Sequence, residues 1–336
     1  MKNLIIPEHY RSSLDLRKTA FAIKTVKDLF QTELARALHL TRVSAPLFVS
    51  ADSGLNDNLN GVERPVRFDL KEMPGEEVEI VHSLAKWKRM ALYQYGFQPG
   101  EGIYTDMNAI RRDEEMTNLH SVYVDQWDWE KVIDSSTRNI PYLKDTVQKI
   151  VYAICDTLEA VKKEYPQIQT KLSPEVSFVT TQELEDQYPE LSPKEREDAY
   201  LKEHKTAFIM QIGGKLKSGI RHDGRAPDYD DWKMNGDIVF WNDVLGRAFE
   251  VSSMGIRVDP KSLDEQLREA GCDDRRKYPF HQMLLDGTLP LTMGGGIGQS
   301  RVCMLLLGKA HIGEVQVSVW DNDTKEACKA AGVVLL

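Results

Sequence analysis

The sequence predicts an α+β protein with a mixed, mainly antiparallel sheet and helices packed on it. Segments with helical spacing of apolar residues alternate with short segments of strand character, and the strand segments come in pairs. A strict strand–helix–strand series, typical of a parallel sheet, is absent. The chain has 336 residues, of which 41% are hydrophobic, so it can build a sizeable core in one large domain or two ordinary ones.

A long helix is predicted between about Leu14 and Leu40, with Ser12 or Ser13 as its cap. The apolar residues that recur there at helical spacing are Ile23, Val26, Phe30, Leu34 and Leu38. The next segment, "TRVSAPLFVS", has strand character but contains Pro46. Because proline cannot donate to a central ladder, we expect this strand at a sheet edge or an interface.

Four further elements follow in the first half of the chain. "VHSLAKWKRMALYQYGF" predicts a short helix capped by Ser83. "EGIYTDMNAIRR" and "LHSVYVDQWDWE" predict two strands joined by the charged turn "RRDEEMTN". A long amphipathic helix is predicted from Pro141 to Glu164.

In the second half, "VSFVTTQELEDQYPELSPKEREDAYLKEHKTAFIMQIGG" predicts a strand, two polar helices and a strand. "RHDGRAPDYDDWKMNGD" indicates a polar loop, and "DIVFWN" with "RAFEVSSMGIRVD" indicates a hairpin. Ser262 and Glu265 have the spacing of a capping box that opens a helix. A glycine cluster, an apolar helix "RVCMLLLG" and a strand "EVQVSVW" complete the prediction.

Charge and cysteine content limit the class of protein. The net charge of −9 argues against a nucleic-acid partner, and an anionic substrate needs a local basic pocket. No cysteine pair or Cys/His cluster has zinc spacing, which favours free thiols in a reducing cytoplasm. We find neither a signal-peptide pattern nor an apolar run long enough to span a membrane, so we expect a cytoplasmic enzyme or binding protein.

The stretch "TMGGGIGQSR" near the end of the chain matches neither a phosphate loop nor a dinucleotide fingerprint. It predicts a strand that ends in a glycine turn, followed by a helix with Arg301 in its first turn. Glycines let a flat group approach the backbone, and an arginine there stacks on a ring or binds phosphate oxygens. The alternative is a tight turn with a surface arginine.

Lys88 is a second candidate, because it falls on the apolar side of its predicted helix. That stripe consists of Leu84, Trp87 and Ala91. Lys86 and Arg89 are predicted to point away from it. An inward lysine either extends its head to water or meets an anion.

Alternation along "HSVYVDQWDW" places Gln126 and Asp128 on one face at the end of a strand. An amide and a carboxylate so arranged can hold the ammonium and carboxylate of an amino acid. The alternative is a strand that leaves the core for solvent.

Asp237 and Glu250, on the predicted hairpin, can hold magnesium against a nucleotide, or lie at exposed edges.

Three segments together resemble the catalytic core of class II aminoacyl-tRNA synthetases. These are a long helix running into "TRVSAPLFV" with Pro46, then "NAIRRDEEMTNLHSVYV" with Arg111, then "GGGIGQSR" with Arg301. More closely, the chain resembles the ammonia-dependent asparagine synthetase (aspartate–ammonia ligase) family. The segments that carry this likeness are "EVEIVHSLAKWKR", "LHSVYVDQWDWE", "RAPDYDDW", "NGDI", "EVSSMGIRVD" and "GGGIGQSR".

The resemblance implies a six-to-eight-stranded, mainly antiparallel sheet flanked by helices, a homodimer formed through the first motif, and one catalytic domain over residues 1–336 without an anticodon-binding domain. It implies that Arg111 binds the ATP α-phosphate and that Arg301 stacks near adenine or holds the outer phosphates. It implies Mg²⁺ on Glu250 and Asp237.

The aspartate site would be formed by Ser83, Lys88, Gln126 and Asp128, with Asp57 and Asp230 in the same pocket. Further ATP contacts would come from Ser253, Gly294, Gly295, Gly296 and Gly298. In the second motif both Arg111-x-Asp113 and Arg112-x-Glu114 fit, and Arg111 is preferred because the family strand ends there.

The implied reaction has two steps. The aspartate β-carboxylate attacks the ATP α-phosphate, and ammonia then converts the β-aspartyl adenylate to asparagine and AMP. Asp57 or Asp230 would take a proton from ammonium.

An aspartyl- or asparaginyl-tRNA synthetase is disfavoured, because the motifs leave no chain for an anticodon domain and the charge is wrong for tRNA. A non-catalytic paralogue would be expected to lack the arginines or the metal carboxylates. A glutamine-dependent enzyme would need a cysteine nucleophile near the N-terminus, where none lies.

Overall fold

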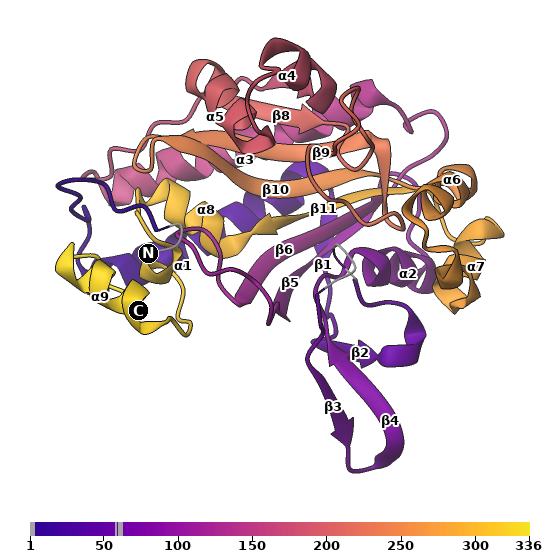
Figure 1. Cartoon of the computed structure of the whole chain (residues 1–336). Helices are drawn as coiled ribbons and strands as arrows, with labels where there is room; N and C mark the ends of the chain where they lie inside the picture. Colours follow the sequence, from indigo (N-terminus) through magenta and orange to yellow (C-terminus); the bar gives the residue numbers. More distant parts are fainter. Residues whose placement is uncertain (1–3, 58, 60–62) are drawn as a thin grey trace.

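The computed structural model of the chain describes residues 4–57, 59 and 63–336, and within them the principal feature is an eight-stranded sheet (Figure 1). Its strand order is β1-β5-β6-β11-β10-β9-β8-β7. The bounds are β1 Leu40–Arg42, β5 Gly102–Ile110, β6 Tyr123–Val132, β7 Ser177–Thr180, β8 Thr206–Met210, β9 Asp230–Asn242, β10 Arg247–Arg257 and β11 Thr292–Gly298. Only the two outermost pairs, β1 with β5 and β7 with β8, are parallel. The predicted mixed, mainly antiparallel sheet is therefore confirmed.

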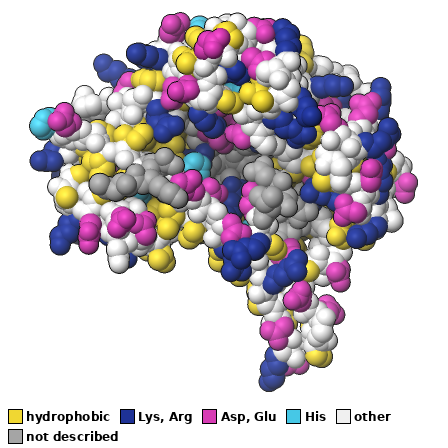
Figure 2. All heavy atoms as spheres, in the orientation of Figure 1, with side chains coloured by type: hydrophobic (Ala, Val, Ile, Leu, Met, Phe, Trp, Pro, Cys, Tyr) yellow, Lys and Arg dark blue, Asp and Glu magenta, His cyan; other side chains and the backbone are white. Residues whose placement is uncertain are grey.

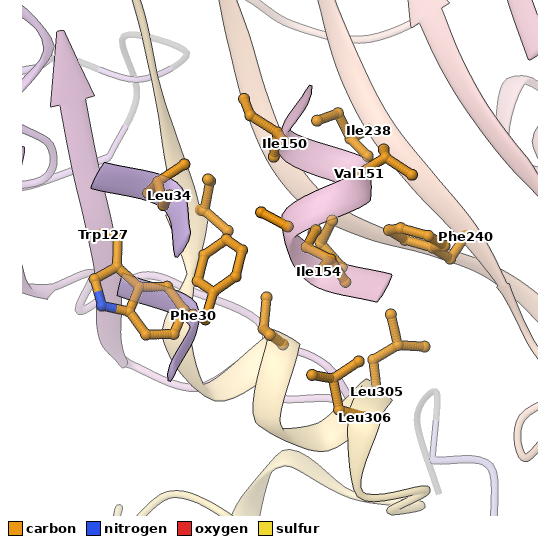
Figure 3. Close-up of a cluster of buried hydrophobic side chains, with 14 of the residues drawn as sticks. Phe30, Leu34, Trp127, Ile150, Val151, Ile154, Ile238, Phe240, Leu305 and Leu306 are labelled. Carbon is orange, nitrogen blue, oxygen red and sulfur yellow. The ribbon is translucent and has the colours of Figure 1, made fainter. Parts of the chain in front are cut away.

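One face of the sheet is covered by three helices, α1 (Leu16–Leu38), α3 (Ile140–Glu164) and α8 (Gln299–Leu306). Figure 3 shows Phe30 and Leu34 of α1 beside Trp127 of β6, and the apolar face of α3 against β9. Side chains alternate along β9, so Ile238 and Phe240 enter this core. Asp237 consequently lies on the opposite face, where the polar residues gather.

The opposite face is covered at its two ends and left open between them. At one end α4 (Thr181–Gln187) and α5 (Pro193–His204) pack on β7, β8 and β9. At the other end α2 (Ala85–Tyr95) packs on β5, next to a unit formed by α6 (Pro260–Ala270), the short 3-10 helix η2 (Asp273–Lys277) and α7 (Pro279–Leu285). The polar middle of the sheet is therefore accessible between these two groups of helices.

A small second sheet, which the sequence analysis did not anticipate, projects from the body as an arm (Figure 1). It contains β2 (Phe48–Ser50), β4 (Met73–Ile80) and β3 (Arg67–Leu70) in that order, and the 3-10 turn η1 (Ala51–Ser53) follows β2. β2 and β3 have only three and four residues and β4 is mostly exposed, so the apolar alternation in this arm is too short to predict strands.

The strand predicted around Pro46 is interrupted. β1 ends at Arg42 and β2 starts at Phe48, and Pro46 lies between them in irregular chain. β1 is an edge strand, as predicted.

The predicted C-terminal strand "EVQVSVW" is wrong: a 3-10 turn, η3 (Ile312–Glu314), leads into irregular chain, and α9 (Asn322–Ala330) follows. The alternation there reflects exposed valines, since Val317 and Val319 are 71% and 75% exposed.

The helix starts also differ from the predictions. Asp15, rather than Ser12 or Ser13, caps α1 by accepting from the Lys18 backbone N–H. Asp259 caps α6, and Ser262 lies at the third helical position instead of opening the helix. In both cases the acidic residue just ahead of the helix satisfies an otherwise unpaired N–H group. α2 has no side-chain cap. No helix in the described part of the chain is long and apolar enough to cross a membrane.

Candidate active site

The open middle of the sheet forms a cavity of about 380 Å³. Its walls come from β6, β9, β10 and β11, from the start of α2, and from the segments 111–121 and 223–230. Acidic and basic side chains are interspersed over the face of the molecule shown in Figure 2. Most of the residues that the sequence analysis selected line this cavity: Asp57, Ser83, Lys88, Arg111, Gln126, Asp128, Asp230, Asp237, Glu250, Ser253, Gly295, Gly296, Gly298 and Arg301.

Lys88 and Asp128 form a buried ion pair at one end of the cavity. Lys88 is 1% exposed and donates to an Asp128 carboxylate oxygen and, at 2.9 Å, to the Gly295 carbonyl. The inward orientation predicted for Lys88 is thus confirmed, and its partner is an anion. The second carboxylate oxygen of Asp128 has no hydrogen-bond partner in the described structure. A buried carboxylate oxygen without a donor is costly, so a cationic ligand group is well accommodated there.

A second buried ion-pair network lies next to Lys88. Arg257 binds both oxygens of Glu130, with Nη2 2.7 Å from Oε2, and also pairs with Asp230. Arg225 lies 3.8 Å from the other oxygen of Asp230. The sequence analysis missed Glu130 and Arg257. Strand alternation would have found them, since Glu130 continues the face of Gln126 and Asp128.

Asp57 differs from Asp230 in its partners. Its carboxylate accepts from the Ser83 hydroxyl at 2.8 Å and from the Leu59 backbone N–H at 2.8 Å. Among the described residues no basic side chain forms an ion pair with it, although it is 3% exposed. Ser83 was predicted to cap α2, but α2 has no side-chain cap and the Ser83 hydroxyl donates to Asp57; Ser83 also lines the cavity.

The glycines of the cluster lie inside strand β11, between β6 and β10, rather than in a turn. A side chain at Gly296 would collide with Gln126 and Asp128, and one at Gly298 would crowd Arg301. No side chain therefore covers the β11 backbone at these two positions on the cavity side, and we call this surface the bare glycine floor. Gly294 is different: it does not line the cavity, and a side chain there would collide with the Glu130 carboxylate. Its absent side chain makes room for the buried ion pair.

Arg111 lies on the cavity wall just beyond β5. Its guanidinium donates to the His82 carbonyl, with Nη2 3.2 Å from the oxygen. Within the described part of the chain no carboxylate lies within ion-pair distance of it. Arg112 is exposed and does not line the cavity, and Asp113 pairs with Arg64 at the surface. The geometry therefore favours Arg111 over Arg112 as the cavity arginine.

Arg301, in the first turn of α8, crosses the floor to β10. Its Nη1 donates to the Glu250 backbone carbonyl at 3.1 Å and lies 3.5 Å from the Glu250 carboxylate. His120, on the facing segment, was missed by the sequence analysis. Burial and the charge of Arg301 lower the pKa of His120 to about 3, so its ring is neutral at pH 7. With Leu119 and Ile312 nearby on the wall, this end offers flat and apolar surfaces.

Asp237 and Glu250 come together across the β9–β10 hairpin. Asp237 accepts from Ser253 at 2.7 Å and from Arg225 at 2.6 Å. Burial, and secondarily the charge of Glu250, raise the pKa of Asp237 to about 6 in spite of Arg225. Burial also acts to raise the pKa of Glu250, but Arg301, Lys194 and Arg225 lower it to about 2. Two interacting carboxylates on one wall favour a bound cation.

Lys86 and Arg89 of α2, which were predicted to point away from the apolar stripe, are nevertheless buried, and both are 2% exposed. Lys86 pairs with buried Asp228 at 3.3 Å, and Arg89 donates to the carbonyls of Val258 and Pro290. The α6–α7 unit encloses α2 on this side, so basic side chains satisfy buried acceptors. A helical wheel drawn from apolar residues alone does not reveal such a contact.

Solved structures with the same architecture include asparaginyl-tRNA synthetases. The enzyme from Pyrococcus horikoshii complexed with asparaginyl-adenylate superposes with a TM-score of 0.65, at 15% identity, over 89% of this chain and 68% of that chain. The one from Entamoeba histolytica in complex with asparaginyl-adenylate gives 0.64 at 13% identity, over 90% of this chain and 66% of that chain. The fold is therefore that of the class II aminoacyl-tRNA synthetase catalytic core.

The sequence defines the family within that fold class. Residues 17–332 match the aspartate-ammonia ligase family model. The aspartate–ammonia ligase of Ruminiclostridium cellulolyticum is 62% identical over the full length of both chains. That of Clostridium tetani is 61% identical over 335 residues, which cover 100% of this chain and 98% of the relative. The chain belongs to the aspartate–ammonia ligase family, and the resemblance and enzyme class that the sequence predicted are confirmed.

Proposed function

We propose that this ligase amidates L-aspartate with ammonia through β-aspartyl-AMP, giving L-asparagine, AMP and pyrophosphate. The observation that carries the proposal is the position of Arg111, a cavity guanidinium that lacks a carboxylate partner among the described residues and lies beside the bare glycine floor. A fixed cation in that setting suits the charge that develops on an α-phosphate. The opposite end of the cavity, with Lys88 and the half-satisfied Asp128, suits a small amino acid.

In the first step, an oxygen of the aspartate β-carboxylate attacks the α-phosphorus of ATP, and the bond to the bridging oxygen of pyrophosphate breaks. Asp128 would accept from the substrate ammonium, while Lys88 and Gln126 orient its carboxylates. Arg111 would stabilise the non-bridging oxygens of the α-phosphate, and Arg301 the nucleotide ring or the outer phosphates. The substrate supplies its own nucleophile, so no side-chain nucleophile is required.

In the second step, ammonia attacks the carbonyl carbon of the adenylate, and AMP leaves with the electron pair of the broken C–O bond. Of the two predicted bases we favour Asp57, because Asp230 is engaged by Arg257 and Asp57 has no basic partner in the described structure. Asp57 would bind ammonium and take a proton from it. With a carboxylate base, the ammonium KM changes little with pH, and Asp57→Asn should make it fall about tenfold per pH unit.

ATP in this enzyme would carry Mg²⁺, for which Asp237 and Glu250 are the candidate ligands. Carboxylate oxygens are the ligands that Mg²⁺ prefers, and it commonly takes one or two of them together with substrate phosphates. No group of three or more His, Cys, Asp or Glu side chains with metal-site geometry occurs in the described residues. When bound, Mg²⁺ would neutralise charge on the phosphates. Ser253 and Arg225 hold Asp237 in place for this role.

We further propose that residues 1–336 act as one catalytic domain, that two copies form a homodimer through α1, β1 and the Pro46 segment, and that the enzyme works in the cytoplasm without nucleic acid. The support for the dimer is that β1 is a sheet edge with a proline just beyond it. Light scattering at micromolar concentration should give twice the chain mass. A fully active monomer would contradict the dimer.

The test of the reaction is an incubation with ATP, Mg²⁺, aspartate and ammonium, followed by separation of nucleotides and amino acids. AMP with asparagine is the expected result. ADP instead of AMP would indicate an acyl phosphate and overturn the adenylate route. Parallel incubations with tRNA test a synthetase activity, and absence of any product would favour a non-catalytic binding protein.

A further inference from the structure

Helix α5 lies along the nucleotide end of the cavity. The side chain of Asp198 accepts from the Ala248 backbone N–H at 2.7 Å, which ties the helix to β10 two residues before Glu250. Lys194 is one helical turn earlier on the same side of α5. Neither residue lines the cavity itself, and the sequence analysis treated this helix only as a polar one. The position of Lys194 is therefore at the rim, on the side of Asp237 and Glu250.

The ammonium of Lys194 connects α5 to the wall of the cavity. It lies 3.1 Å from Glu197 of the same helix and 3.3 Å from Asp223, which lines the cavity next to Arg225. Its side chain is 54% exposed, so packing does not fix it against these two carboxylates. A rim ion pair of this exposure contributes little to stability, which leaves the placement of Lys194 without an evident structural purpose.

The electrostatics agree with that geometry. Burial acts to lower the pKa of Lys194, but the carboxylates of Glu197, Asp223, Glu250 and Asp237 raise it overall. Lys194 in turn contributes to the low pKa of Glu250 and of His120. The charge of Lys194 therefore acts on two groups of the nucleotide end, Glu250 and His120, and it stays positive at any physiological pH.

We propose that Lys194 is a further nucleotide-binding residue, whose ammonium binds the outer phosphates of ATP and the pyrophosphate that leaves. The proposal rests on the proposed function for the identity of the nucleotide and its leaving group. When the bond between the α-phosphorus and the bridging oxygen breaks, the electron pair goes to pyrophosphate, and negative charge grows on the outer phosphates. Lys194 would exchange Asp223 for a phosphate oxygen and stabilise that charge.

The test compares binding of ATP, pyrophosphate and AMP by calorimetry, without turnover, for the wild type, Lys194→Met and Lys194→Arg. Lys202→Met is the matched control, because Lys202 is an exposed lysine in the last turn of the same helix. Loss of one charged hydrogen bond should weaken ATP and pyrophosphate about 10- to 100-fold in Lys194→Met and leave AMP unchanged. Lys194→Arg should retain most of the affinity, and Lys202→Met all of it.

Two results would overturn the proposal. One is pyrophosphate binding within twofold of wild type in Lys194→Met. The other is an equal loss for ATP, pyrophosphate and AMP, which would mean that Lys194 only holds the wall through Asp223. Because these are binding measurements, they are independent of whether the wild-type enzyme makes AMP or ADP. The product analysis above tests the proposed function separately.

Discussion

The two ends of the cavity differ in how their charges are satisfied. At the amino-acid end, Lys88 pairs with Asp128, and Arg257 with Glu130 and Asp230, all inside the protein. At the nucleotide end, Arg111 and Arg301 donate chiefly to backbone carbonyls, and Lys194 and Glu250 are partly exposed. At the first end the charges are paired inside the protein, apart from one oxygen of Asp128, whereas at the second end the basic side chains are held by backbone carbonyls or by partly exposed carboxylates.

This difference separates stability from catalysis. A buried ion pair is costly to break, since the remaining charge is left without water or a partner. A guanidinium that rests on a carbonyl at a cavity wall is cheap to remove and is free to meet a phosphate. Substitutions at the amino-acid end should therefore lower the free energy of unfolding, and substitutions at the nucleotide end should lower the rate with little effect on folding.

The largest effect is expected for Lys88→Met, which removes the partner of buried Asp128. We expect a loss of about 3–5 kcal/mol of unfolding free energy, together with a strongly raised aspartate KM. Sequence reasoning alone predicts little loss of stability for this variant, because it does not reveal the pair. Denaturant unfolding and aspartate titration measure both. Adding Asp128→Asn should recover stability but not aspartate binding, and a stable single variant would show that the pair is not buried in solution.

Arg111→Ala should lower aspartate-dependent ATP–pyrophosphate exchange about 10²–10³-fold, the usual cost of losing one donor to a developing charge. The melting temperature should stay close to that of the wild type, because Arg111 has no ion pair in the described structure. Arg112→Ala is the matched control and should be nearly as active as the wild type, since Arg112 is exposed. If the two variants exchanged roles, the assignment of the second-motif arginine would be wrong.

The pH dependence of the carboxylate pair gives a third test. Burial raises the folded-state pKa of Asp237 to about 6, so protonation should compete with Mg²⁺ below that pH. We expect Mg²⁺-dependent ATP affinity to fall by up to about tenfold per pH unit below pH 6. The stability effect has the opposite sign: the folded state holds this proton more tightly than the unfolded chain, so Asp237 makes stability fall as pH rises from about 4 to 6.

Calorimetric titration of the enzyme with ATP and Mg²⁺ between pH 5 and 7.5 measures the Mg²⁺-dependent ATP affinity. Urea unfolding over pH 4–7 measures the change in stability. Asp237→Asn should remove both. An Mg²⁺ dependence that is flat across pH 6 would argue against Asp237 as a ligand.

The smallest effect is expected for Ser83→Ala, which removes one hydrogen bond to Asp57. We expect a rise in the ammonium KM of about 2- to 10-fold, the usual range for one hydrogen bond. The control is Ser253→Ala, which touches Asp237 at the other end and should leave the ammonium KM unchanged. An ammonium KM that did not respond to Ser83→Ala would weaken the case for Asp57 as the ammonium site.

Sequence reasoning located most of the site because strand and helix periods place residues on faces. Gln126 and Asp128 share a strand face, and Lys88 lies on the inner side of α2, as the periods predicted. Glu130 and Arg257 were missed although they lie in strands, and other missed residues come from chain without a strand or α-helix period. Arg225 and Tyr229 lie on the polar segment before β9, Ile312 begins the 3-10 turn η3, and Gln316 lies in irregular chain that was predicted to be a strand.

The sequence by itself determined the fold class and the set of chemical groups, because these follow from local periodicity and from residue types, and it determined the family through the resemblance of its motifs. Tertiary structure decided which charges are neutralised. Asp57 and Asp230 are equivalent by type, yet only Asp230 meets Arg257, which lies on the neighbouring strand β10. Arg111 and Arg112 are adjacent, yet one faces the cavity and the other solvent. Which ion pairs form depends on contacts between residues that are distant in the chain. Helix and strand periods relate only residues that are close in sequence, so they cannot predict these contacts.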